Sequence, residues 1–101
     1  MTINQERDGN WLTLRLEGRL DTSTAPALEE IVMNSFDGLI QVIMDFEKLE
    51  YLSSAGLRVL LAAQKKMNKQ GEMVLRNVNE TVMEVFEVTG FVDILTIESK
   101  I

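Results

Sequence analysis

Two adjacent serines, Ser53 and Ser54, are the side chains of this sequence whose type and position best suit chemistry. They follow the loop-like segment 47–52 and stand where the pattern predicts that a helix begins, at residue 54. A helix N-terminus exposes unpaired N–H groups and the positive end of the helix dipole, so a phosphate on a serine there is electrostatically favoured. The simpler interpretation is that one of the two serines is only the N-cap, because serine is a preferred N-cap residue.

Catalysis by these serines would need a general base that the sequence does not offer. The chain has no histidine and no cysteine, which excludes a Ser-His-Asp relay, thiolate nucleophiles and Cys/His zinc sites. The nearest lysines on the predicted helix, Lys65 and Lys66, lie about three turns away. The carboxylates of Asp45, Glu47 and Glu50 are better explained by a solvated loop than by a metal site. We therefore expect a protein that is not an enzyme and has no metal and no cofactor.

Length and charge narrow the class of protein further. The chain has 101 residues, of which 46% are hydrophobic and 26% charged, as expected for one folded domain over residues 1–101. A net charge of −6 argues against binding to nucleic acid or to anionic membranes. The N-terminus does not resemble a signal peptide, and no apolar run approaches ~20 residues. We expect a cytoplasmic protein.

The hydrophobic pattern predicts an α/β fold, because short strand-like segments alternate with helix-like ones. The expected strands are residues 2–7, 11–17, 39–46, 72–76 and 93–98, and the expected helices are residues 23–36, 54–69 and 80–89. The order is β-β-α-β-α-β-α-β. Because helical crossovers make the later strands parallel, we expect a mixed sheet of about four to five strands packed with helices.

Two segments carry a resemblance to a known family. One is Gly18-Arg19-Leu20-Asp21, and the other is Asp45-Phe46-Glu47-Lys48-Leu49-Glu50-Tyr51-Leu52-Ser53-Ser54-Ala55-Gly56-Leu57-Arg58-Val59-Leu60. Together they resemble the STAS domain and, more narrowly, the bacterial anti-sigma factor antagonists. The resemblance covers nearly the whole chain, with the elements in the same order.

The resemblance implies a non-enzymatic switch. Such antagonists bind an anti-sigma factor that is also a serine kinase, and this binding frees the sigma factor. The kinase phosphorylates one serine at the start of the second helix, the modified form dissociates, and a serine phosphatase resets the cycle. By motif position the phosphate acceptor is Ser54, with Ser53 as the alternative. The residues expected at or near the partner-binding surface are Asp21, Thr22, Ser53, Ala55, Gly56 and Arg58, and the chain alone is expected to be monomeric. The alternative is an interaction module, or a binding module for a small ligand such as a nucleotide or lipid, in another signalling assembly.

The sequence departs from the commonest family pattern in three places. Ser53 stands where the family often has Asp, and Ala55 stands where it often has Ser or Thr. The first departure is what makes Ser53 an alternative acceptor. Family members usually carry a last helix after the final strand, whereas only residues 99–101 follow it here.

Overall fold

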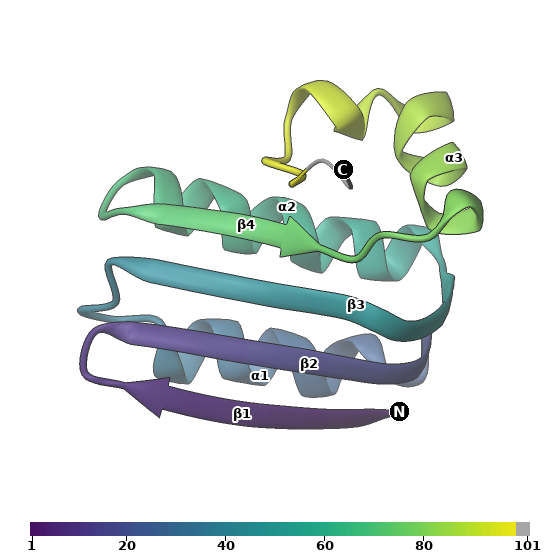
Figure 1. Ribbon diagram of the computed structural model, residues 1–101. Helices are drawn as coiled ribbons and strands as arrows, with labels where there is room; N and C mark the ends of the chain where they lie inside the picture. Colours follow the sequence, from purple (N-terminus) through teal and green to yellow (C-terminus); the bar gives the residue numbers. More distant parts are fainter. Residues whose placement is uncertain (99–101) are drawn as a thin grey trace.

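Four strands form one mixed sheet in the computed structural model, which describes residues 1–98 (Figure 1). The strands are β1 (Thr2–Asp8), β2 (Trp11–Leu20), β3 (Gln41–Leu52) and β4 (Glu72–Arg76), and they lie side by side in that order. The hairpin pair β1 and β2 is antiparallel, whereas β2–β3 and β3–β4 are parallel. The predicted α/β fold with a mixed sheet is confirmed.

Two helices supply the crossovers between the parallel strands, α1 (Ala25–Ser35) from β2 to β3 and α2 (Ser54–Asn68) from β3 to β4. A third helix, α3 (Glu80–Thr89), follows β4, and a short 3-10 turn (Phe91–Asp93) follows α3. Figure 1 shows α1 and α2 on the same face of the sheet, with α3 beyond its β4 side. No helix of residues 1–98 covers the opposite face of the β1–β2–β3 part of the sheet (Figure 1).

The core lies between the sheet and the helices. Leu12, Leu14 and Leu16 of β2 are buried, while the intervening Arg15 is exposed, as the alternation of side chains along a strand requires. From the helical side, Leu60 of α2 is fully buried against the sheet. Burial of one such leucine favours folding by about 1.5–3 kcal/mol.

Strand β3 differs from the predicted strand at residues 39–46, because it begins at Gln41 and runs on to Leu52. The register between β2 and β3 shifts twice, so that β3 holds an extra residue at each shift. At such a bulge two residues oppose one on the neighbouring strand. The buried residues of this stretch, Phe46, Leu49 and Leu52, are consequently three apart instead of two. That spacing hid the strand and made residues 47–52 look like a loop.

The predicted last strand at residues 93–98 is wrong. The chain first makes the 3-10 turn, in which the N–H groups of Ile94 and Leu95 donate to the carbonyl of Phe91 at 3.0 and 2.9 Å. Up to residue 98, one isolated parallel bridge follows, between Ile97 and Leu75 of β4. Leu95 is buried in the core and Ile97 packs against it, whereas Ile94 is exposed, so these residues form no ladder. The expectation that no helix follows concerns residues 99–101, which lie outside the described residues.

Candidate functional site

The two serines have different places at the start of α2. Ser53 is the N-cap, with an extended backbone at φ −99° and ψ 174°, and its side chain accepts a hydrogen bond from the N–H of Gly56 at 3.5 Å. Ser54 is the first residue of the helix, and its side chain is exposed. The interpretation of a serine as N-cap is therefore right for Ser53. The hydroxyl of Ser54 has no cap role and faces solvent.

The ends of β2 and β3 bring Asp21 to the same edge of the sheet as the serines. Leu20 and Leu52 are paired neighbours in these parallel strands, and the N–H of Ser53 donates to the carbonyl of Leu20 at 2.9 Å. Asp21 directly follows Leu20, so the turn that begins with it starts beside the N-terminus of α2. The sequence separation between Asp21 and Ser54 is thus bridged by strand pairing.

The carboxylate of Asp21 organises the turn that leads into α1. It accepts hydrogen bonds from the N–H of Ser23 at 3.0 Å, from the Ser23 hydroxyl at 2.8 Å and from the N–H of Thr24 at 3.2 Å. In return, the N–H of Asp21 donates to the Thr24 hydroxyl at 2.9 Å. This turn occupies residues that we expected in the helix, so α1 begins at Ala25 instead of residue 23. Asp21 is therefore a structural residue of the turn, whatever else it does.

These hydrogen bonds make the contribution of Asp21 to stability depend on pH. The Ser23 hydroxyl is the largest cause that lowers the pKa of Asp21 below its ordinary value, and backbone N–H donors add to it, while partial loss of hydration opposes it. A carboxyl whose pKa is lowered by folding stabilises the folded state above its unfolded pKa, and this stabilisation disappears as the pH falls through the folded pKa.

We expect Asp21→Asn to unfold at lower urea than the wild type at neutral pH. The difference should shrink as the pH is lowered from about 5 to about 2, where the wild-type carboxyl becomes protonated as well. Urea midpoints at both ends of this range measure the effect. Ser23→Ala removes the main donor and should show the same trend, and a difference that is constant across the range would contradict it.

A shallow groove between the first turns of α1 and α2 gathers several of the predicted residues. Its lining consists of Thr22, Ala25, Pro26, Glu29, Ala55, Arg58 and Val59. Thr22 and Arg58 are exposed and Ala55 is half-buried, so three of the predicted partner-binding residues lie on one surface next to Ser54. The α1 side of the groove, with Pro26 and Glu29, was missed, because nothing in the sequence tells which exposed face of α1 lies beside α2.

Gly56 was expected at or near the partner-binding surface, but it is buried. A Cβ atom at this position would lie 2.7 Å from both Leu20 Cγ and Leu52 Cδ1. Atoms that close overlap, so only glycine lets α2 approach the ends of β2 and β3 this tightly. The visible role of Gly56 is to position Ser54 by close packing.

A cluster of Arg19, Tyr51 and Asp21 beside the site was also not predicted from the sequence. The guanidinium of Arg19 lies 4.2 Å from the ring centroid of Tyr51, to which Arg19 is paired across the β2–β3 ladder. The Nε atom of Arg19 is also 3.8 Å from Asp21 Oδ2. Cross-strand pairing creates this exposed cluster, and it depends on the second register shift, which the sequence does not reveal.

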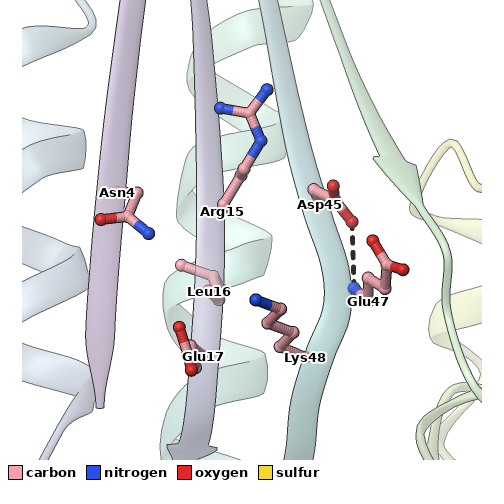
Figure 2. Close-up of a pocket in the computed structure, with 7 residues that line it drawn as sticks. All are labelled: Asn4, Arg15, Leu16, Glu17, Asp45, Glu47 and Lys48. Carbon is pink, nitrogen blue, oxygen red and sulfur yellow. Dashed lines mark hydrogen bonds between the residues drawn. The ribbon is translucent and has the colours of Figure 1, made fainter.

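A separate hollow lies on the face of the sheet that the helices leave uncovered, at the first register shift of β3 (Figure 2). It is lined by Asn4, Arg15, Leu16, Glu17, Asp45, Glu47 and Lys48. Figure 2 shows that these side chains come from β1, β2 and β3, and none of the predicted site residues is among them. Asp45 Oδ1 accepts from the N–H of Glu47 at 3.0 Å and from the Asn77 amide at 2.9 Å, so this carboxylate holds the bulge and the end of β4. Within residues 1–98, no group of three or more potential ligands is arranged to hold a metal ion.

The comparisons with known proteins agree with this fold. The chain matches the STAS domain over residues 2–101. The protein BtrV of Bordetella bronchiseptica, assigned to the anti-sigma factor antagonists, is 35% identical over 102 residues, which cover 99% of this chain and 88% of BtrV. The anti-sigma-B factor antagonist of Listeria monocytogenes is 32% identical over 98 residues, covering 94% of this chain and 85% of that protein.

Two solved structures share the fold at lower identity. An anti-sigma factor antagonist from Mycobacterium paratuberculosis superposes with a TM-score of 0.85 at 23% identity, covering 99% of this chain and 86% of the other. The Bacillus cell fate determinant SpoIIAA in its phosphorylated form superposes with a TM-score of 0.67 at 19% identity, covering 98% of this chain and 93% of SpoIIAA.

The mixed sheet with two helices on one face defines a small α/β domain. The chain belongs to the STAS domain family, and its relatives are anti-sigma factor antagonists. Between residues 1 and 98, no helix is both long and apolar enough to cross a lipid bilayer.

Proposed function

We propose that this chain is an anti-sigma factor antagonist that is switched by phosphorylation of Ser54. In its unmodified form it binds an anti-sigma factor that is also a serine kinase, and a serine phosphatase restores this form after phosphorylation. The observation that carries the proposal is the exposed hydroxyl of Ser54 at the start of α2, beside the groove between α1 and α2. The assignment of the relatives as anti-sigma factor antagonists supports the choice of partner, and the fold is also that of SpoIIAA, a protein known in a phosphorylated form.

The mechanism is a change of charge on a docking surface. Unmodified Ser54 is small and neutral, so the first turn of α2 and the groove beside it can lie flat against the kinase. Asp21, Thr22, Ser53, Ala55 and Arg58 surround the contact, and Gly56 lets the helix sit where it does. Phosphorylation adds about −1.5 to −2 charges at this surface. In a desolvated interface, the charge on Ser54 is repelled by the phosphates of the nucleotide that the kinase binds. This repulsion lowers the affinity of the chain for the kinase.

The loss of binding free energy that the switch requires is modest. A change in affinity of about 100-fold corresponds to about 2.7 kcal/mol of binding free energy, and a desolvated, unfavourably placed phosphate can supply it. No catalytic group on this chain is needed, because the kinase and the phosphatase carry out the chemistry. We further propose that the chain acts as a cytoplasmic monomer.

Capture of partners on the immobilised chain, read by mass spectrometry with and without ATP, tests this function. We expect a small ATP-binding kinase to be retained without ATP and released when ATP is supplied. Calorimetric titration of that kinase should give an affinity about 100-fold lower for the phosphorylated chain than for the unmodified chain. Equal affinities would overturn the switch.

Partner capture and a thermal unfolding measurement separate the alternatives. Retention of a multi-subunit assembly without a kinase would favour an interaction module. A raised melting temperature with a nucleotide or a lipid would favour a small-ligand module, because a ligand that binds only the folded state stabilises it.

A further inference from the structure

Arg58 is an exposed cation whose charge is unmatched in the site. Four ion pairs are described within residues 1–98, and they involve Arg15, Arg19, Lys66 and Arg76 but not Arg58. The carboxylate that shares its groove, on Glu29 across in α1, is not within ion-pair distance of the guanidinium. Arg58 is therefore free to take up a new anionic partner.

The helix places that cation beside the proposed phosphate acceptor. Ser54 and Arg58 both belong to α2 and are four residues apart, so their side chains are neighbours on one face of the helix. Side chains in an α-helix lean towards its N-terminus, so an arginine at position 58 is within reach of the turn that contains Ser54. The first turn of α2 carries no acidic residue that would compete for the guanidinium.

We propose that Arg58 is a positioning residue that pairs with the phosphate on Ser54. The inference rests on the proposed function, since the phosphate is the product of that switch. A guanidinium matches a phosphate with two parallel hydrogen bonds, whereas an ammonium acts as a point charge. The pair holds the phosphate against the first turn of α2 and stabilises its dianion, so the modified surface carries its full charge in one fixed orientation.

The expected sign is a lowered second pKa of the phosphoserine, which ordinarily lies near 6. The chain is prepared with phosphoserine installed at position 54 during translation, and the phosphate is titrated by phosphorus NMR. Arg58→Ala should raise this pKa by about 0.15–0.4 pH units, the shift that corresponds to the energy of an exposed pair one turn apart. Arg58→Lys should give an intermediate value. The shift should shrink in 1 M salt, because exposed charges are screened there.

Lys65→Ala is the matched control. It removes the same charge from an exposed position of the same helix, but near the far end of α2. We expect it to leave the phosphate pKa unchanged, and circular dichroism confirms that each variant is folded. A phosphate pKa that is the same in Arg58→Ala and Lys65→Ala would overturn the pairing. Because the phosphoserine is installed without a kinase, this failure is distinct from a failure of the kinase to modify Ser54, which would overturn the proposed function instead.

Discussion

We expect replacement of Ser54 by alanine to abolish phosphate uptake, while the chain should still fold and still bind its kinase. The side chain of Ser54 is exposed and makes no cap hydrogen bond, so its removal should change the free energy of unfolding by no more than about 0.5 kcal/mol. Alanine is also a good residue for the first turn of a helix. Incubation with the partner kinase and ATP, followed by intact mass measurement, should show one added phosphate on the wild type and none on Ser54→Ala.

Ser53→Ala is the control, and its expected behaviour is the reverse. Loss of the N-cap hydrogen bond to Gly56 should lower the free energy of unfolding by about 0.5–2 kcal/mol. The acceptor hydroxyl of Ser54 remains, so this variant should still take up one phosphate. A phosphate on Ser54→Ala together with none on Ser53→Ala would move the acceptor to Ser53. No phosphate on the wild type with a competent kinase would contradict the switch altogether.

Leu60→Ala should be the most destabilising of the substitutions considered. The Leu60 side chain is 0% exposed on the face of α2 that packs against the sheet. Removal of a fully buried leucine side chain loses its transfer free energy and leaves a cavity, which together cost about 2–5 kcal/mol. Chemical denaturation measures the loss, which is a large share of the ~5–15 kcal/mol expected for a domain of this length.

Leu61→Ala provides the comparison, because Leu61 is the next residue on α2 but is only partly buried. Its replacement should cost clearly less than that of Leu60, since less of its surface leaves water on folding. A cost for Leu60→Ala below about 1 kcal/mol, or equal costs for the two variants, would mean that α2 presents a different face to the core.

The parts of the fold that follow from local periodicity could be predicted from the sequence. The period of two in Leu12, Leu14 and Leu16 identified β2, and the helical spacing of Leu57 and Leu60 identified α2. The second half of β3 could not be predicted, because two register shifts against β2 remove the period. The segment around Ile97 has the composition of a strand, but tertiary packing turns it into a 3-10 turn and one bridge.

Part of the candidate site could likewise be predicted from the sequence, and part could not. Sequence reasoning located the serine pair at a helix start, but the choice of N-cap depends on the backbone angles of Ser53, which the sequence does not show. Asp21 was placed near Ser54 only through the family resemblance. The physical cause of its position is the parallel pairing of Leu20 with Leu52, a contact between residues far apart in the chain. Its hydrogen bonds to Ser23 and Thr24 give it a structural role that the resemblance did not suggest.

The single bridge to Leu75 has a consequence for amide hydrogen exchange. The N–H of Leu75 donates to the carbonyl of Thr96 at 2.9 Å, and the carbonyl of Leu75 accepts from the N–H of Glu98 at 2.9 Å. The amide of a buried residue in β4 is thus protected by the C-terminal segment, whereas the amides shared by β2 and β3 are protected by the sheet itself. Because short, lightly anchored segments open at a lower free energy than the core, Leu75 should exchange earlier than its neighbours in the ladder. Each such opening turns β4 into a free sheet edge, with a donor and an acceptor that another extended strand can occupy.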